Sequence, residues 1–360
     1  MRIGIDAREL CGHATGVGRY LAGLLDEWSV DERARRHEFV LYAPEPVGVA
    51  LDAHRFATRT IPGPGDTWWE QVKVRAVASR DHLDVWFSPA YSLPLLLNVP
   101  AVVTIHDVSF VAHPEWFHVR EGIRRRLLCR RSAARARQVI TISEFTRREL
   151  VERLHVPDEK IHVIAPGVRS PRPATGAPAP SAPVVLFVGS IFNRRHLPDL
   201  IRAFAPLARA HADARLEIVG DNRTHPHEDL PRAIARQGLT ARVHWHQYVT
   251  DDRLRELYRQ ARAFAFLSEY EGLGLTPLEA LACSVPPVLL DTPVARESCG
   301  DAALYVPRGN IAAITRALDA ALFSTDVRRR VLTAAPATLA RYQWPCAAAQ
   351  TLALLEKTAA

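Results

Sequence analysis

The chain has 360 residues, of which 48% are hydrophobic and 24% are charged, and its formal net charge is +7. This composition is typical of a folded globular protein and excludes an extended disordered chain, while the length favours two domains over one. Apolar runs stay shorter than the ~18 residues that a membrane-spanning helix needs.

The amino-terminal sequence MRIGIDAREL and the five cysteines both indicate a cytoplasmic location. Charged residues at Arg2, Asp6, Arg8 and Glu9 interrupt the apolar run that a secretory signal would require. The cysteines are odd in number and lack Cys-x-x-Cys spacing, which argues against a disulfide framework and against a zinc site. We therefore expect a cytoplasmic protein.

Short apolar runs of strand length alternate with longer segments of helical period, which is the pattern of parallel βα units. In the first half we expect strands at residues 2–6, 38–43, 84–88, 101–107, 138–143 and 161–167. In the second half we expect them at 184–190, 214–220, 242–247, 263–268, 286–291 and 303–307. The pattern predicts an α/β chain with two doubly wound, Rossmann-like parallel sheets.

A segment rich in Pro, Ala and Gly separates the two sets of strands and predicts a linker at residues 171–183. We therefore expect one domain at residues 1–170, a second at 184–345, and a final segment at 346–360. Ligands of open α/β sheets bind at the carboxyl ends of the strands, so we expect a central cleft where the two sheets face each other.

The stretch EYEGLGLTPLEALACSVPPVLL, Glu269–Leu290, joins an expected strand to an expected helix. With Thr276 as N-cap, Pro277 as the first helical residue and Glu279 three residues after the cap, the segment is typical of a capping box. A nucleotide site is the second interpretation, because glycines at 272 and 274 let the backbone approach a diphosphate at a helix N-terminus. Glu279 would then accept hydrogen bonds from the ribose hydroxyls. The spacing alone leaves both interpretations open.

The run SEYEGLGLTPLEALACSVPPVLLD, residues 268–291, resembles the E-x7-E segment of retaining GT-B glycosyltransferases of family 4, also called glycosyl transferases group 1. The resemblance implies that Glu271 holds the transferred sugar and that Glu279 binds the ribose. It also implies that the residues between them line the donor site: Gly272, Leu273, Gly274, Leu275 and Thr276. Matching segments follow one another in the family's order over most of the chain.

VGSIFNRRHLPDLIRAF, residues 188–204, resembles the family segment in which a basic pair reaches the donor diphosphate. The resemblance assigns Gly189 and Arg194 to the donor site and places Arg195 where the family usually has a lysine. Arginine keeps the charge but presents a planar fork, so we expect the phosphate contact to persist with altered geometry. Without the resemblance, a solvated basic loop would be the simpler interpretation.

Two motifs of the first half also resemble the family. HATGVGRYLAGLL, residues 13–25, places Gly16 and Gly18 between the first expected strand and helix, although Leu21 stands where a dinucleotide motif needs a third glycine. The resemblance implies that these glycines lie near the donor phosphate and the acceptor. In TIHDVSFVAHPEWF, residues 104–117, it implies that His106 forms a hydrogen bond with the transferred sugar rather than abstracting a proton.

The resemblance further implies transfer from a nucleoside diphosphate sugar with retention at the anomeric carbon. Residues 1–170 would form the acceptor-side domain, residues 184–345 the donor domain, and residues 346–360 a helix that crosses back to the first domain. No D-x-D triplet occurs in the chain, so we expect neither a metal ion nor a resident cofactor. GDP-mannose is the favoured donor and a UDP-sugar the alternative. A saccharide or a lipid-linked glycan is the expected acceptor.

Eight arginines and one acidic residue lie between Arg120 and Arg137. Apolar residues at Ile123 and Leu127 fall near one helical face, which favours docking of this segment on an anionic membrane surface at the inner face of the membrane, or contact with an anionic lipid-linked acceptor. A solvated basic face and a nucleic-acid site are the alternatives. The segment contains no aromatic residue on which bases could stack, so we expect no nucleic-acid partner.

Two other classes of protein compete with a glycosyltransferase. A GT-B sugar-nucleotide epimerase binds the same donors but needs no acceptor. A basic module that binds membranes or polyanions without catalysis would use the glycine loops only as turns, and its binding would depend strongly on salt.

Overall fold

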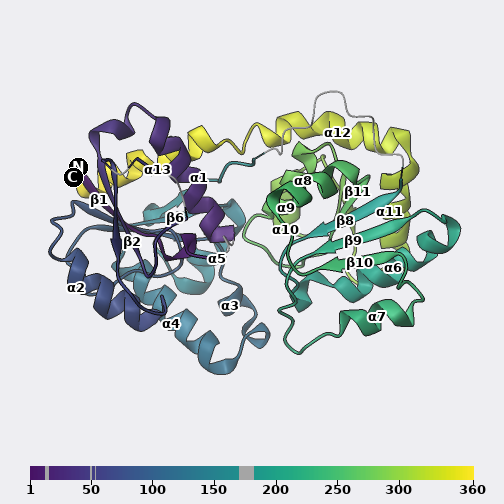
Figure 1. Cartoon of the computed structure of the whole chain (residues 1–360), viewed down its shortest axis with the longest axis horizontal. Helices are drawn as coiled ribbons and strands as arrows, with labels where there is room; N and C mark the ends of the chain where they lie inside the picture. Colours follow the sequence, from purple (N-terminus) through teal and green to yellow (C-terminus); the bar gives the residue numbers. More distant parts are fainter. Residues whose placement is uncertain (13–15, 49–50, 53, 170–181) are drawn as a thin grey trace. The chain divides into compact units, whose positions relative to one another are not determined.

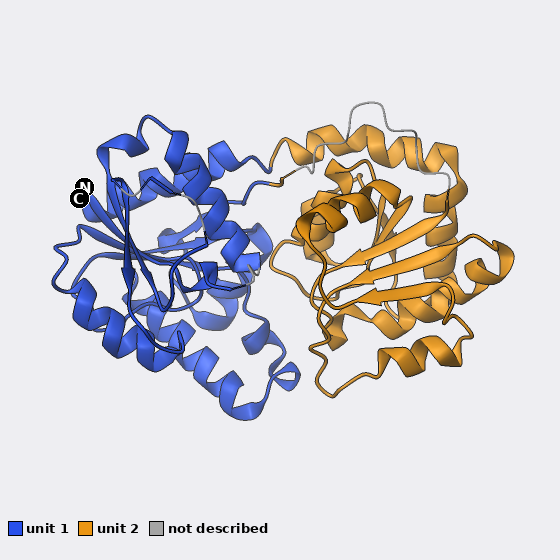
Figure 2. Ribbon diagram, in the orientation of Figure 1, with its two compact units in different colours: residues 1–167, 342–360 blue, residues 168–341 orange. Residues whose placement is uncertain are grey.

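The computed structural model describes residues 1–12, 16–48, 51–52, 54–169 and 182–360. The described chain divides into two compact units, residues 1–167 with 342–360 and residues 168–341 (Figure 2). Each unit is built on one parallel sheet with helices on its faces (Figure 1). Most of the predicted linker, residues 171–181, lies outside the described residues.

The sheet of the first unit has seven parallel strands among the described residues, in the order β3-β2-β1-β4-β5-β6-β7. The strand order reverses between β1 and β4, where Ile5 pairs with Leu41 on one side and with Phe87 on the other. The bounds are β1 (Arg2–Asp6), β2 (Glu38–Ala43), β3 (Phe56–Thr60), β4 (Val85–Ser88), β5 (Ala101–Ile105), β6 (Gln138–Thr141) and β7 (Ile161–Val163).

Helices cover both faces of this sheet because its side chains alternate in direction. Phe39 and Leu41 belong to the core under α1 and α13, whereas Val40 and Tyr42 belong to the core under α2, α4 and α5. The helices are α1 (Gly16–Val30), α2 (Arg75–Ala78), α3 (Ser109–Ala112), α4 (Val119–Arg135), α5 (Glu144–Leu154) and α13 (Trp344–Ala359).

The second unit has a six-stranded parallel sheet in its described residues, in the order β10-β9-β8-β11-β12-β13. The strands are β8 (Val184–Val188), β9 (Arg215–Val219), β10 (Val243–His246), β11 (Ala263–Phe266), β12 (Pro287–Leu290) and β13 (Leu304–Val306). The helices are α6 (Leu197–Ala210), α7 (Leu230–Arg236), α8 (Asp251–Gln260), α9 (Leu275–Ala282), α10 (Pro293–Cys299), α11 (Ile311–Phe323) and α12 (Thr325–Leu339).

The prediction of two doubly wound parallel sheets is confirmed, and each of the twelve predicted strands is present, two with the predicted bounds and ten with shorter ends. The strand β3 was not predicted. It lies at the edge of the first sheet, where only Phe56 is buried and Thr58 and Thr60 are exposed, so its sequence lacks the apolar run of an inner strand.

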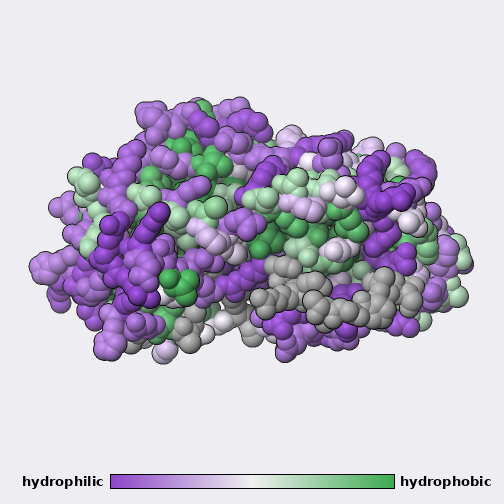
Figure 3. Space-filling model, turned by 90° about the horizontal axis from the view of Figure 1, so that it is seen from above, coloured by the Kyte–Doolittle hydropathy of each residue, from purple (hydrophilic) through white to green (hydrophobic). Residues whose placement is uncertain are grey.

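The face drawn in Figure 3 is largely hydrophilic, with apolar side chains in separate patches. None of the helices in the described part of the chain has both the length and the apolar character that crossing a membrane requires.

Candidate functional site

Two loops of the second unit leave neighbouring strands at the point where the strand order reverses. The first follows β8 and contains Gly189 and a short 3-10 turn at Asn193–Arg195. The second follows β11 and contains Glu271 before the start of α9. Because β8 and β11 are paired and parallel, both loops emerge at the same edge of the sheet, the usual ligand position in such folds.

An ion pair between Arg195 and Glu271 joins these loops. The Glu271 Oε1 atom accepts hydrogen bonds from Arg195 Nε at 2.9 Å and from the Ser268 hydroxyl at 2.8 Å, and it lies 2.8 Å from Arg195 Nη2. The Arg195 and Glu271 side chains are 12% and 17% exposed, respectively, so the pair is largely shielded from solvent but is still accessible to a ligand. Oε2 takes no part in these bonds. The two charges predicted to act on phosphate and sugar therefore lie together.

Gly189 supports the position of Arg195. Its φ of +140° is one that residues with a side chain rarely adopt, and a Cβ atom there would lie 2.5 Å from Arg195 Nη1. The same guanidinium donates through Nη1 to the Ser190 carbonyl at 2.6 Å. A glycine is therefore required where the backbone of the first loop passes the guanidinium.

Arg194 also ties the first loop to the second. Its Nε donates to the Tyr270 carbonyl at 3.2 Å, and its carbonyl accepts from the Glu269 amide at 3.0 Å. The guanidinium carbon lies 4.3 Å from the centre of the Phe192 ring, a cation–π contact. Arg194 thus fixes the geometry of both loops in addition to its positive charge.

The predicted capping box at Thr276 is wrong. The helix α9 begins at Leu275, and its N-cap is Gly274 with a φ of +87°, so Thr276 lies inside the first turn and Glu279 lies in the second. Gly274 has no side chain with which to cap, and Pro277 has no N–H to be satisfied. The first turn therefore presents the main-chain amides of Leu275 and Thr276 together with the positive end of the helix dipole.

Glu279 does not belong to a capping box and makes a tertiary contact instead. Its Oε2 accepts a hydrogen bond from the Tyr258 hydroxyl at 3.1 Å, which links α9 to α8. Burial, and secondarily the Glu279 charge, raises the pKa of the Cys283 thiol to about 12. Cys283 is therefore protonated at neutral pH and is no candidate nucleophile.

His106 follows β5 in the first unit and is held on several sides. Its Nε2 lies 2.7 Å from the Pro89 carbonyl, and its ring packs edge-on against Tyr20 of α1 with centroids 4.9 Å apart. A carbonyl only accepts, so Nε2 carries the proton and Nδ1 is the acceptor atom. Burial lowers the pKa of His106 below its ordinary value, which favours this neutral form.

The glycines of the first half lie elsewhere than predicted. Gly16 and Gly18 both belong to the first turn of α1 instead of the loop before it. Residues 13–15 of the predicted loop lie outside the described residues. Leu21, at the place of the missing third glycine, is fully buried in the core.

Tyr91 was not predicted as part of the surroundings of His106. It has a φ of +45°, its hydroxyl donates to Asp107 Oδ2 at 2.8 Å, and its ring centre lies 5.8 Å from that of His106. A residue with a side chain in the left-handed region carries strain of the kind that collects at functional sites. No local sequence pattern marks Tyr91, since only the fold brings it beside His106.

A buried charge cluster after β1 was also missed. Arg8 pairs with Asp6 and with Glu70, and Glu70 accepts a further hydrogen bond from Ser92 at 2.8 Å. Glu70 is fully buried, and this burial raises its pKa against the opposing effect of Arg8. The signal in the sequence that could have indicated this cluster was the polar segment directly after an apolar strand.

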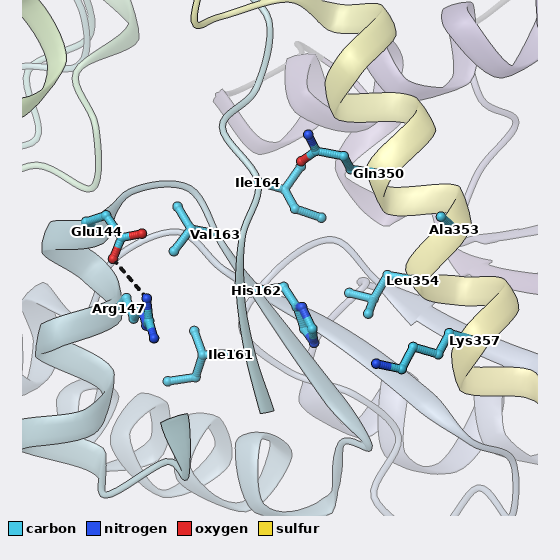
Figure 4. Close-up of a pocket in the computed structure, with 10 residues that line it drawn as sticks. All are labelled: Glu144, Arg147, Ile161, His162, Val163, Ile164, Gln350, Ala353, Leu354 and Lys357. Atoms are coloured by element: carbon cyan, nitrogen blue, oxygen red, sulfur yellow. Dashed lines mark hydrogen bonds and ion pairs between the residues drawn. The ribbon is translucent and has the colours of Figure 1, made fainter. Parts of the chain in front are cut away.

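Two cavities differ in their relation to these residues. A small pocket of about 20 Å³ adjoins Glu271 and Ser268, with room for about one water molecule. A larger pocket of about 530 Å³ lies in the first unit, and none of the predicted site residues lines it (Figure 4). Among the described residues, no group of three His, Cys, Asp or Glu side chains is arranged to hold a metal ion.

Comparison with known families accounts for both halves of the chain. A family described as Glycosyl transferases group 1 matches residues 173–337, and one described as Glycosyltransferase Family 4 matches residues 14–172. The chain is 28% identical over 295 residues to O-antigen chain mannosyltransferase B of Escherichia coli, covering 77% of this chain and 76% of that protein. It is 30% identical over 252 residues to GDP-mannose:cellobiosyl-diphosphopolyprenol alpha-mannosyltransferase of Xanthomonas oryzae, covering 68% of this chain and 64% of that protein.

Solved structures resemble the fold along the whole chain. Sucrose-phosphate synthase from Thermosynechococcus elongatus superposes with a TM-score of 0.79 at 18% identity, covering 99% of this chain and 98% of that chain. HepE from Anabaena in complex with UDP-glucose superposes with a TM-score of 0.73 at 19% identity, covering 99% and 100%. At these identities the likeness shows the fold, which is that of the GT-B glycosyltransferases.

Proposed function

The chain belongs to glycosyltransferase family 4, the glycosyl transferases group 1, and we propose that it transfers a mannosyl group from GDP-mannose to a saccharide or lipid-linked acceptor. The names of two relatives, an O-antigen mannosyltransferase and a GDP-mannose-dependent mannosyltransferase, support this donor and this class of acceptor. A UDP-sugar is the alternative donor, in line with the HepE complex. The Arg195–Glu271 pair at the reversal point of the second sheet is the observation that carries the proposal.

The diphosphate would bind where the two loops of the second unit meet. Arg195 and Arg194 supply positive charge there, and the first turn of α9 supplies main-chain amides and the positive end of its dipole. Negative charge grows on the diphosphate as the sugar leaves, so these preorganised groups would stabilise the transition state more than the bound donor. Positive charge from this chain's own groups takes the place of a metal ion in the proposal.

Glu271 would hold the hydroxyls of the transferred sugar. Its Oε1 is engaged by Arg195 and Ser268, which leaves Oε2 to accept from the donor. A carboxylate committed to an ion pair is suited to positioning rather than to taking a proton. In line with the family resemblance, we propose retention at the anomeric carbon, with the leaving phosphate oxygen accepting the proton of the incoming hydroxyl. Glu279 would bind the ribose hydroxyls.

His106 would accept a hydrogen bond from a sugar hydroxyl through Nδ1. The Nε2 proton is directed at the Pro89 carbonyl, and the lowered pKa keeps the ring neutral at physiological pH. The histidine would therefore position the sugar without exchanging a proton with it. Gly16 and Gly18, in the first turn of α1, would lie on the acceptor side.

The helix α4 is the proposed contact with the inner face of an anionic membrane. Val119, Ile123 and Leu127 lie one helical turn apart and are 75%, 51% and 48% exposed, so the apolar stripe faces solvent instead of the core. Exposed arginines flank the stripe, including Arg120, Arg124 and Arg130. Apolar side chains with cationic neighbours are the features of a helix that lies in a membrane interface.

A transfer assay with radiolabelled donors tests the proposed function. GDP-mannose and UDP-glucose are each incubated with the protein, with and without lipid-linked oligosaccharides extracted from bacteria. We expect label from GDP-mannose to enter the glycan, with retained configuration by NMR. Formation of an epimerised sugar nucleotide in the absence of acceptor would show that the protein is an epimerase. If no donor reacted, the protein would instead be a binding module without catalysis.

Flotation with anionic vesicles tests the membrane contact separately. The double variant Ile123→Ser and Leu127→Ser should bind vesicles of phosphatidylglycerol more weakly than the wild type, because it removes apolar anchors and keeps every arginine. Val30→Ser, at the exposed end of α1, removes an apolar side chain of similar exposure (70%) and should bind as the wild type does. Equal binding of all three proteins would contradict the role of α4.

A further inference from the structure

The pocket in the first unit is a groove along the edge of its sheet (Figure 4). The strand β7 is the last in the order of the sheet, and among the described residues it pairs with β6 alone. The walls of the groove come from α5 and α13, which cover opposite faces of the sheet. Its volume of about 530 Å³ lies within the ~300–1,000 Å³ of ordinary ligand pockets.

The floor of the groove carries main-chain hydrogen-bonding groups. In a parallel sheet, alternate residues direct their N–H and C=O toward opposite neighbours. The Ile164 amide donates to the Thr141 carbonyl on the β6 side, so the main-chain groups of Val163 point away from β6 and into the groove. The Ile161 amide is already used by the Asp158 carbonyl, whereas the Ile161 carbonyl points the same way as Val163. Such an unpaired edge is a template for another strand.

The walls restrict what can reach this edge. Side chains of Ile161 and Val163 point toward α5, and those of His162 and Ile164 point toward α13, so the strand lies between two helices (Figure 4). A folded sheet edge, such as β7 of a second copy, would bring its own covering helices against these walls. A single extended peptide without flanking helices has no such obstruction.

The charges of the two walls differ. On α5, the Arg147 guanidinium is balanced by Asp158 at 2.6 Å and by Glu144 at 3.3 Å. On α13, no carboxylate among the described residues pairs with Lys357, whose ammonium points toward His162 (Figure 4). The α13 wall is therefore cationic, while Leu354 and Ala353 beside it are apolar.

We propose that the groove binds an extended acidic segment of a partner protein, which adds to β7 as a further strand and places a carboxylate against Lys357. Main-chain hydrogen bonds to Ile161 and Val163 would supply affinity, and the side-chain contacts would supply specificity, as in other cases of strand addition. This inference is independent of the proposed sugar transfer, because it uses none of the donor-site residues.

Synthetic hexapeptides test the proposal by calorimetric titration of the full-length protein. The acidic probe is acetyl-Glu-Val-Glu-Val-Glu-Val-amide, and lysine replaces glutamate in the basic probe. A third probe is the acidic peptide methylated on every main-chain nitrogen, which keeps charge and side chains but removes the donors to the strand from both edges of the peptide. We expect binding of the acidic probe alone. Absence of its binding at millimolar concentration, or equal binding of the basic or the methylated probe, overturns the proposal.

Charge reversal at one residue gives the matched test. Lys357→Glu should weaken binding of the acidic probe at least about tenfold, as expected for loss of one charge-assisted contact, and should create binding of the basic probe. Arg148→Glu makes the same change of charge on an exposed residue of α5 that does not line the groove, so it should bind as the wild type does. Equal weakening by both variants would indicate only long-range attraction and would contradict the site. Hydrogen exchange should show slower exchange of the Val163 amide with the acidic probe bound.

Discussion

Arg195 and Glu271 stand 76 residues apart in the chain and 2.8 Å apart in space, between Nη2 and Oε1. The pair joins two loops that leave adjacent strands, and it is buried enough for its charges to act strongly on a bound anion. The family resemblance implies that Arg195 contacts the phosphate and that Glu271 contacts the sugar. In the proposed function, this contact would hold both ends of the scissile bond in one rigid unit.

Replacing Arg195 should affect turnover more than donor binding. Arg195→Ala removes positive charge where negative charge develops, so we expect kcat to fall about 10²-fold while the Kd for GDP changes less than about tenfold. Arg195→Lys should recover part of kcat, because it restores charge without the planar fork. Arg329→Ala, in an exposed pair with Asp326, is the control and should match the wild type. Equal losses of kcat and binding would contradict a role in the transition state.

Adding one methyl group at Gly189 should displace Arg195. In Gly189→Ala the new Cβ would lie 2.5 Å from Nη1, and the φ of +140° is strained for alanine. We expect lower kcat and a loss of stability of about 1–3 kcal/mol, measured by urea unfolding. Gly48→Ala is the control, because a Cβ there meets no atom within 4 Å. An active, stable Gly189→Ala protein would show that the guanidinium position is not critical.

The corrected start of α9 makes a prediction about stability. Thr276→Ala should change the midpoint of urea unfolding little, because Thr276 is not the N-cap. Asp229→Ala should cost about 1 kcal/mol, because the Asp229 carboxylate accepts from the Arg232 amide at 2.9 Å as the N-cap of α7. A comparable loss in both variants would restore the capping box that the structure contradicts.

The neutral state of the half-buried His106 predicts a dependence of stability on pH. Its folded pKa lies below the unfolded value of 6.5, so its contribution to stability is present above pH 6.5 and is lost as the pH falls through the folded pKa. His106→Asn should therefore lose less stability on acidification than the wild type. His37 and His162, whose pKa burial also lowers, are present in both proteins and cancel in the difference. If the thermal midpoints of the wild type and of His106→Asn changed with pH in parallel, the assignment of a neutral His106 in the folded protein would be contradicted.

The parallel sheets could be predicted because buried strands are marked by local apolar runs, as in VVLFV of β8. The edge strand β3 was not predicted because its polar, alternating sequence resembles that of a loop. The capping box failed for a similar reason, since local spacing fitted Thr276 while the left-handed conformation of Gly274 moved the helix start. Local patterns therefore identified elements better than their ends.

The contacts of the candidate site depend on residues far apart in sequence. Only the family resemblance identified Arg195 and Glu271 as site residues, and it did not predict the contact between them. Neither the tautomer of His106 nor the strained position of Tyr91 has a local signal, because Pro89, Tyr20 and Asp107 approach them through the fold.

Nucleotide-dependent thermal unfolding tests directly whether the second unit contains a sugar-nucleotide site. GDP, UDP, ADP and dTDP are compared on the wild type, on Glu279→Ala and on Glu256→Ala, an exposed carboxylate of α8 paired with Arg253. A nucleotide at a hundredfold excess over its Kd should stabilise the fold by about 2.7 kcal/mol. We expect stabilisation by GDP for the wild type and Glu256→Ala, and much less for Glu279→Ala. Stabilisation by no nucleotide, or equal stabilisation of all three proteins, would contradict this expectation.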